Sequence, residues 1–319
     1  MPAADLPVLA SEGDPRIGDP RIGDLALGLI QQQVRRLGQL HHAVLADDDP
    51  EALHKLRISL RRLRSGLEVF APALLLPEGV HASRIARVAR RTGLTRDLDV
   101  FRERLENPWW PQLPEGEQVA LAKAMARLKR DRRQAFEGMV EALNGGRYLK
   151  LLALLNQWQS APSYSLLGQQ RLTPWLSDWV CHLGQGLFLH NGWFVADPAA
   201  EDLHELRKRI KGLRYNLEPF IPFLPTKMLG WIEELKQAQT VLGELHDLTV
   251  LEASLLSQPL RRKASPLPTL QGAISQRQQQ HWQQWQAQAG RLSSDANRQD
   301  LHRLILAPAD NQGALLGQG

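Results

Sequence analysis

The sequence has little cysteine, no long apolar run and no pattern typical of β-strands. Its single cysteine, Cys181, provides neither a disulfide framework nor a zinc-binding spacing, which fits a reducing compartment. No apolar run approaches the roughly 20 residues that a membrane-spanning helix requires, and residues 1–24 lack the basic and apolar regions of a secretory signal. We therefore expect a cytoplasmic protein without a membrane partner. Cys181 has no pattern of His or Asp partners, so we expect it to be a buried small residue.

The composition is typical of a globular protein and carries a mild excess of positive charge. The chain has 319 residues, of which 43% are apolar and 23% charged. A chain of this length has room for about two domains. The formal net charge is +5 and the sequence pI is about 9.5. Because this excess is small, any argument about a partner must rest on where the positive charges lie.

One helical stretch occurs twice in the chain. His54–Phe70 aligns without a gap with His204–Phe220, at an offset of 150 residues. At about 100° per residue, each copy has an apolar stripe and a basic stripe beside it, which ends at a glutamate. The apolar stripes hold Leu53, Leu56, Leu60, Leu63 and Leu67 in the first copy, and Leu203, Leu206, Ile210, Leu213 and Leu217 in the second. The basic stripes hold His54, Arg57, Arg61 and Arg64 in the first copy, and His204, Arg207, Lys208, Lys211 and Arg214 in the second.

A second motif follows each copy at the same offset. Thr92–Val100 aligns with Leu242–Val250, and each stretch contains a glycine followed by Arg-Asp or His-Asp. Neither glycine, Gly93 or Gly243, lies in the Gly-rich strand–turn–helix context of a phosphate loop. We therefore expect these glycines to allow close approach between helices.

The periodicity of apolar residues and the positions of proline and glycine predict helices throughout. In the first half we expect helices over residues 25–46, 50–70, 80–105, 115–143 and 147–159. In the second half we expect a helix over 174–189, a basic helix that ends near Pro219 or Pro222, a helix that contains 242–250 and a glutamine-rich helix over 268–292. We expect a disordered leader over 1–24, helical halves over 25–160 and 165–306, and a loose tail over 307–319. The predicted fold is all-α, with two helical halves of four or five helices each that are related by a pseudo-twofold axis, so that the two basic helices can face each other and build one shared cationic cavity.

The repeated basic stripe has an ordinary interpretation as a solvated surface, which is the commonest role of a basic helix face. Three features favour a binding site instead. The positive residues are not interleaved with acids at i,i+4, the stripe recurs in both halves, and it lies next to the core stripe. Clustered cations repel one another, and a bound anion would offset that repulsion. Arg forms bidentate hydrogen bonds to phosphate, Lys acts as a point charge, and protonated His54 and His204 would add charge.

These residues and their order resemble the CHAD family of helical domains. The resemblance rests on His-x-Leu-Arg-x-x-x-Arg/Lys-x-Leu-Arg-x-x-Leu-Glu-x-Phe followed by Gly-x-x-Arg/His-Asp-Leu-x-Val, found twice between about Leu25 and Leu306. It implies two four-helix bundles around a basic pocket that binds inorganic polyphosphate, at polyphosphate granules in some members. The implied binding positions are His54, Arg57, Arg61, Arg64, His204, Arg207, Lys211 and Arg214. Lys236 matches a further basic position of the family, and its counterpart in the first half is Ala86, with Arg87 and Arg90 nearby. To this set of binding residues we add Arg90 and Lys208.

Three functions follow for this basic site, and the first is preferred. The preferred function is non-catalytic binding of polyphosphate, with other polyanions as further partners and with no cofactor and no metal. The second is binding of RNA or DNA, although aromatic residues apart from Tyr215 are missing from the basic face. The third is a metal-dependent polyphosphate hydrolase that uses the carboxylates Glu68, Glu218, Asp97, Asp99 and Asp247. Asp97 and Asp247 have two open interpretations: they orient the basic groups, or they form structural salt bridges. The nine tryptophans are expected to pack in cores.

Overall fold

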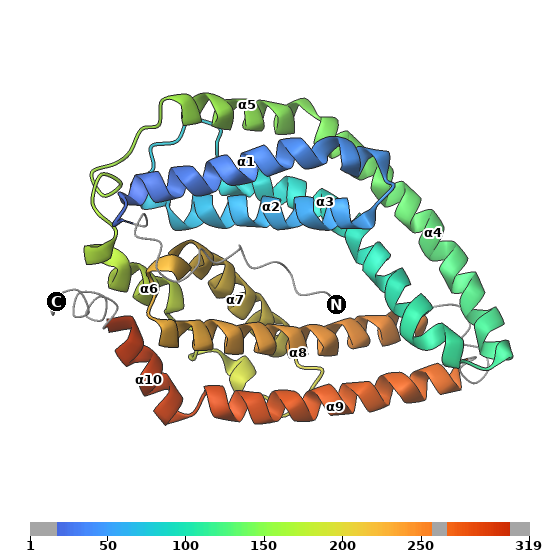
Figure 1. The fold of residues 1–319 in the computed structure, drawn as a ribbon. Coiled ribbons are helices and arrows are strands. Elements are labelled where there is room, and N and C mark those ends of the chain that lie inside the picture. The colour runs from blue at the N-terminus through green and yellow to red at the C-terminus, as the bar shows by residue number, and fades with distance from the viewer. Residues whose placement is uncertain (1–17, 257–266, 307–319) are drawn as a thin grey trace, which may run out of the picture.

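A computed structural model describes residues 18–256 and 267–306 of the chain, and this part is all-α (Figure 1). Within these ranges there is no β-strand, only two isolated antiparallel bridges, Arg21 with Arg171 and Leu74 with Tyr164. The predicted fold class is thus confirmed. Residues 1–17 of the predicted leader and the predicted tail at 307–319 lie outside the described residues.

The first half of the chain forms five helices where the sequence predicts them. Helix α2 begins after Asp49, whose carboxylate accepts a hydrogen bond from the Glu51 amide at 2.8 Å, with Pro50 in the first turn. Asp47 ends α1 in a left-handed conformation, with φ at 59°. The helices are α1 Ile22–Ala46, α2 Pro50–Val69, α3 Ala82–Arg104, α4 Glu115–Asn144 and α5 Gly146–Ser160.

The second half also forms five helices in the described residues. The basic helix of this half ends at Leu217 and continues as a 3-10 helix, Glu218–Phe223. Pro219 and Pro222 lack the amide hydrogen that an α-helix needs at these positions, which explains this change. The helices are α6 Leu176–Gly184, α7 Glu201–Leu217, α8 Thr226–Leu256, α9 Pro268–Leu292 and α10 Asp295–Leu306.

Three helix ends differ from the prediction. Helix α1 begins at Ile22, inside the predicted leader, because the amides of Ile22 and Gly23 donate to the carbonyls of Gln170 and Gly168. After α3 the chain continues as a π-helical turn over Leu105–Trp109. Helix α6 ends at Gly184 instead of residue 189, ahead of Gly186, whose φ of 74° is incompatible with a continuing helix.

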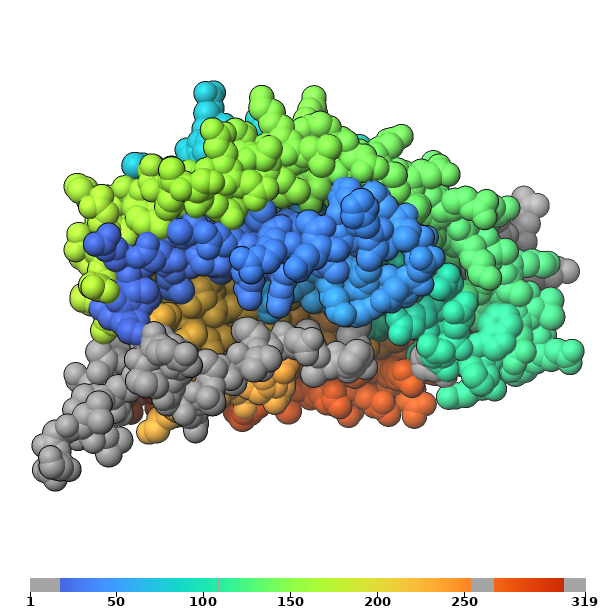
Figure 2. Space-filling view, turned by 45° about the horizontal axis from the view of Figure 1, so that its top comes forward, coloured from blue at the N-terminus to red at the C-terminus, as the bar shows by residue number. Residues whose placement is uncertain are grey.

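Consecutive helices pack side by side, and the two halves share one core. Figure 1 shows α1, α2, α3 and α5 on one side and α7, α8 and α9 on the other. Figure 2 shows α1 and α5 next to each other on the surface. One cluster of buried apolar residues runs from Ile22 in α1 to Ile305 in α10. Six of the nine tryptophans are buried, as predicted: Trp109, Trp158, Trp179, Trp193, Trp231 and Trp285. The division of the chain into two bundles stays a prediction.

A second, smaller core connects the halves at the other end of the molecule. It joins Leu105 and Leu121 near the connection between α3 and α4 to Leu251 and Leu270 near the facing ends of α8 and α9. Here the carboxylate of Glu117 accepts hydrogen bonds from the amides of Thr269 (2.9 Å) and Leu270 (3.1 Å). A carboxylate at a helix N-terminus satisfies otherwise unpaired amides and lies at the positive end of the helix dipole. Glu117 thus attaches the start of α4 to the start of α9.

Candidate site: a central basic cluster

The two copies of the repeat lie on α2 and α7, and these helices contact each other. Their apolar stripes are buried as the sequence predicts: Leu56, Leu60, Leu63, Leu206 and Ile210 have no exposed surface. Burial of this stripe places the adjacent basic stripe at the edge of the core. The amphipathic pattern therefore brings the basic residues of both helices toward the same region.

Residues that correspond in the two copies lie close to each other. The rings of Phe70 and Phe220 have centroids 5.5 Å apart, and both contact the ring of Trp179. Arg61 lies close enough to its counterpart Lys211 to lower the pKa of that lysine. A twofold axis between the copies would bring equivalent residues together in this way. The pseudo-twofold relation itself stays a prediction.

We call eight side chains the central basic cluster. They form four pairs at the 150-residue offset, and all are half-buried. The pairs come from α2 and α7 and from the second motif on α3 and α8. The members are His54, Arg57, Arg61, Arg96, His204, Arg207, Lys211 and His246.

In the first half, hydrogen bonds fix two arginines of the cluster. Arg57 Nη1 donates to the carbonyl of Ala89 at 2.9 Å and to Thr92 Oγ1 at 3.3 Å, both on α3. Arg61 donates to the hydroxyl of Tyr215 on α7 and lies over its ring, 4.7 Å from the centroid. These contacts hold the guanidinium groups in place, which reduces the conformational entropy lost when an anion binds.

The glycines of the second motif make room for the arginines of the first. A side-chain carbon at Gly93 would lie 3.0 Å from Arg57 Nη1, and one at Gly243 would lie 3.4 Å from Arg207 Nε. Each glycine thus leaves space for a guanidinium group above its helix. The sequence predicts a close approach between helices at these positions, whereas the group nearest to each glycine in the structure is an arginine side chain.

In the second half, two polar atoms of the cluster are buried and unused. His204 and His246 lie with ring centroids 4.2 Å apart. His204 Nδ1 and Arg207 Nε are buried and have no hydrogen-bond partner among the described residues. An unpaired buried donor is costly. A ligand with acceptor atoms would satisfy Arg207 Nε and offset that cost.

The pKa values in the cluster reflect burial and mutual repulsion. Burial, followed by the charges of Arg61, Arg207 and Arg57, lowers the pKa of Lys211 to about 7, and Asp97 opposes this shift. Burial also lowers the pKa of His54, with Arg96 as the next cause. Without a ligand, the lowered pKa values thus favour the neutral, deprotonated forms of Lys211 and His54.

The same two causes act on the histidine pair of the second half. Burial is the largest cause that lowers the pKa of both imidazoles. The next cause is the charge of Lys208 for His204, and the charge of His204 for His246. The pKa of each ring is therefore lower than that of an exposed histidine. An anion bound beside the rings would reverse this shift, because it favours the charged forms.

Carboxylates near the cluster are mostly engaged in ion pairs. Glu68 accepts from Arg64 Nε at 2.9 Å, Glu218 from Arg62 Nε at 2.7 Å, and Asp99 from Arg132 Nε at 2.9 Å. Asp247 lies 3.0 Å from Arg104 Nη2, which is the structural salt bridge considered for it. Asp97 is 73% exposed and lies 4.0 Å from Arg57 Nη2. Within residues 18–256 and 267–306, no three His, Cys, Asp or Glu side chains are grouped so that they could hold a metal.

The remaining predicted binding residues lie outside the cluster. Arg64 and Lys208 are exposed and paired with Glu68 and Glu205, and Lys236 is half-buried and paired with Glu233. Arg214 is buried; its Nε donates to Gln239 Oε1 at 3.2 Å, and its guanidinium lies over the Tyr215 ring. Arg90 is exposed on α3.

The binding residues predicted from the sequence omit two members of the cluster, Arg96 and His246. They occupy equivalent positions in the second motif, directly before Asp97 and Asp247. Their Arg/His-Asp pattern is the signal that could have identified them. Cys181 also differs from the prediction, because it is exposed on α6.

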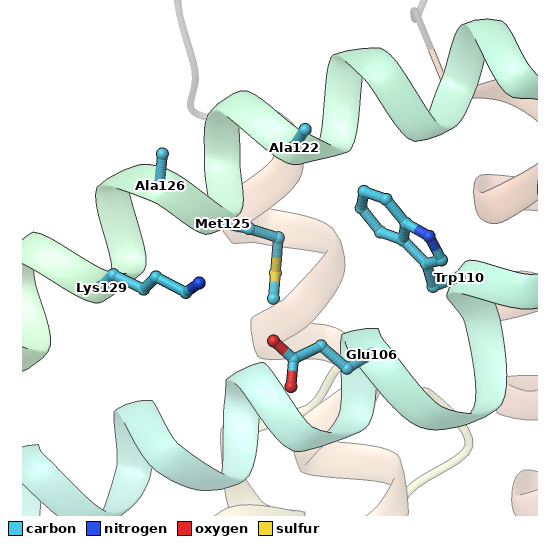
Figure 3. Close-up of a pocket in the computed structure, with 6 residues that line it drawn as sticks. All are labelled: Glu106, Trp110, Ala122, Met125, Ala126 and Lys129. Carbon is cyan, nitrogen blue, oxygen red and sulfur yellow. The ribbon is translucent and has the colours of Figure 1, made fainter.

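The described part of the chain also has an apolar cavity of about 370 Å³ between α4 and the helical turns that follow α3 (Figure 3). Its walls are formed by Glu106, Trp110, Ala122, Met125, Ala126 and Lys129. No residue of the central basic cluster lines it, so this cavity is not the predicted basic pocket. None of the described helices is long and apolar enough to cross a membrane.

Comparison with known proteins identifies the family. The CHAD domain family matches residues 28–256, and no curated protein matches the chain. The crystal structure of the CHAD domain from the plant Ricinus communis has a TM-score of 0.57 and 24% identity, covering 90% of this chain and 93% of that chain. PptA from Streptomyces chartreusis has a TM-score of 0.60 and 18% identity, covering 88% of this chain and all of that one. The family match covers well over half of the chain, and the fold agrees with both structures: the protein belongs to the CHAD domain family.

Proposed function

We propose that the central basic cluster binds inorganic polyphosphate and that the protein catalyses no reaction on it. The observation that carries the proposal is the convergence of positive side chains of α2 and α7 around Lys211, whose pKa is about 7. Repulsion between these positive side chains lowers the stability of the folded protein unless an anion occupies the site. The unused donor at Arg207 Nε supports the same conclusion.

The extent of the cluster favours a chain of phosphates over a single phosphate. His54 and Arg61 are seven residues apart on α2, which is about 10 Å along the helix axis. The same span recurs on α7 between His204 and Lys211. One phosphate group cannot reach all of these side chains, whereas an extended polyanion can. Membership in the CHAD family agrees with this ligand class.

Nucleic acid is the second candidate ligand, and the surroundings of Tyr215 argue against it. Binding of single strands commonly uses exposed aromatic rings on which bases stack. Tyr215 is only 8% exposed, and its ring contacts the guanidinium groups of Arg61 and Arg214. It therefore offers no open ring face to a base. A competition experiment with polyphosphate and a single-stranded oligonucleotide of equal total charge separates the two ligands.

A hydrolase would need carboxylates that are free to hold a metal or a water molecule. Glu68, Glu218, Asp99 and Asp247 are instead paired with arginines. This pairing supports a binding role without catalysis. Release of phosphate that depends on magnesium and is lost in Glu68→Gln with Glu218→Gln would contradict the proposal.

Thermal unfolding tests the proposal directly. A ligand that binds only the folded state stabilises it by roughly 2.7 kcal/mol at one hundred times its dissociation constant. We expect long-chain polyphosphate to raise the melting temperature, and the competing oligonucleotide to raise it less. No shift with polyphosphate in excess would contradict the proposal. Association with polyphosphate granules in the cytoplasm is the corresponding expectation in cells, tested by localising the tagged protein with and without cellular polyphosphate.

A further inference from the structure

Helix α3 carries a second group of arginines outside the central basic cluster. We call Arg84, Arg87, Arg90 and Arg91 the arginine band. All four are exposed. None of their side chains forms a hydrogen bond or an ion pair within the described residues. Residues 82–96 of this helix contain no Asp or Glu, so no acid on this stretch compensates the four charges.

The band lies beside the central basic cluster on α3, with Asp97 between them. The buried face of α3 includes Ile85, Val88 and Thr92, and Gly93 lies beneath the Arg57 guanidinium. On a helical wheel at about 100° per residue, Arg90 is the arginine of the band nearest to Asp97. The other three come next around the helix axis in the order Arg87, Arg91 and Arg84, in steps of at most roughly 60°. Arg84 and Arg96 are about 18 Å apart along the axis. Positive side chains therefore recur from the cluster around α3 to its outer face, with the exposed Asp97 and the exposed Leu94 between them.

The second half of the chain has no such band. At the 150-residue offset, the positions of the four arginines on α8 are held by Glu234, Gln237, Thr240 and Val241. Glu234 is engaged by Arg291, with Nη1 and Nη2 at 2.5 and 2.6 Å from its carboxylate oxygens. The equivalent surface of α8 is therefore neutral or paired, while the cluster itself is retained in both halves.

We propose that the arginine band binds the part of a long polyphosphate chain that extends beyond the central basic cluster, so that the polymer leaves the site over α3 and not over α8. The inference rests on the proposed function and deepens it, because it assigns a direction to the bound polymer. Charge complementarity and the position of the band beside the cluster select a polyanion as the occupant. A short ligand would fill the cluster without reaching the band.

The test compares two triple variants that remove the same charge. Arg84→Gln, Arg87→Gln and Arg91→Gln change the band, and Arg127→Gln, Arg130→Gln and Arg133→Gln change exposed residues of α4. The dissociation constants of tripolyphosphate and long-chain polyphosphate are measured for both variants and the wild type at several salt concentrations. Circular dichroism and thermal unfolding verify that each variant is folded.

The band variant should bind tripolyphosphate with an affinity within about twofold of the wild type. It should bind the long chain roughly tenfold more weakly, because each exposed charge pair contributes a factor of about two to three. The slope of log K against log salt for the long chain should become less steep by about 2, or roughly 0.7 per lost phosphate contact. The α4 variant should retain the long-chain affinity and the slope.

Several results would overturn the inference. Equal weakening by the α4 variant would mean that only net charge matters, and unchanged long-chain binding by the band variant would mean that the band is merely solvated. If the band variant lost affinity only for a single-stranded oligonucleotide measured in the same assay, the band would be assigned to nucleic acid. If the wild type bound neither polyphosphate, the proposed function would fail together with the inference. If it bound both and the band variant behaved as the wild type, only the inference would fail.

Discussion

The affinity for polyphosphate should rise as the pH falls, because Lys211 must be protonated to bind an anion. Its pKa is about 7 in the free protein, through burial and the charges of Arg61, Arg207 and Arg57, while Asp97 acts in the opposite direction. A bound polyanion raises this pKa toward that of an ordinary lysine. Binding then takes up a proton at any pH between the free and the bound pKa.

The sign and size of the effect follow from linkage. Below about pH 7 Lys211 is charged in both states, and its own contribution to the affinity is at its full value. As the pH rises through 7, the free protein loses the proton that the complex retains, so the affinity falls. One unit of pKa difference corresponds to about 1.4 kcal/mol, so Lys211 alone should weaken binding by up to about tenfold per pH unit above 7. The lowered pKa values of His54, His204 and His246 extend this trend below pH 7.

The assay is calorimetric titration with long-chain polyphosphate at constant ionic strength between pH 6 and 9. Two buffers of different ionisation enthalpy give the number of protons taken up. Lys211→Arg retains the positive charge over this range, so it should flatten the dependence above pH 7. Lys150→Arg on α5 is the exposed matched control, and comparison of the two variants removes any titration of the polymer. A wild-type affinity that is constant from pH 6 to 9, or equal proton uptake by Lys211→Arg, would refute the reasoning.

Three further predictions concern stability and geometry. Arg62→Met should lower the free energy of unfolding, measured in urea, by roughly 3 kcal/mol, because it leaves the Glu218 carboxylate unpaired and the Glu218 side chain is only 10% exposed. The double variant with Glu218→Met should recover stability, and no loss in the single variant would contradict the pairing. Lys211→Gln should raise the free energy of unfolding of the free protein most strongly below pH 7, since the lowered pKa means that the unfolded state binds more protons; equal stability of variant and wild type at pH 6 would contradict it. Gly93→Ala should displace the Arg57 guanidinium, whose Nη1 lies 3.0 Å from the added carbon; weaker polyphosphate binding with unchanged helical content is expected, and unchanged affinity would show that the placement of Arg57 is unimportant.

Local signals predict the helices well because they depend on neighbouring residues. Pro50 and Asp49 mark the start of α2, and the apolar stripes of both repeats predict their buried faces. The end of α6 was predicted wrongly because Gly186 has a backbone conformation that a sequence pattern does not specify.

The sequence does not predict which residues of the two halves contact each other. The hydrogen bonds of Glu117 with Thr269 and Leu270, and the pair of Arg62 with Glu218, join residues more than 150 positions apart. Their partners depend on how whole helices are placed against one another. The same is true of Arg214, whose basic stripe position predicts binding but whose side chain is buried against Tyr215.

The most direct test of the account is the dissociation constant of long-chain polyphosphate for a variant that removes two charges from the central basic cluster. Lys211→Gln with Arg96→Gln is suitable, because neither side chain forms a hydrogen bond or an ion pair within the described residues. Arg127→Gln with Arg130→Gln on α4 is the control with the same charge change. The account predicts at least roughly tenfold weaker binding by the cluster variant, since charged hydrogen bonds contribute about 1.5–3 kcal/mol each, and near wild-type affinity for the control. Equal affinities of the two variants would contradict the claim that the cluster is the binding site.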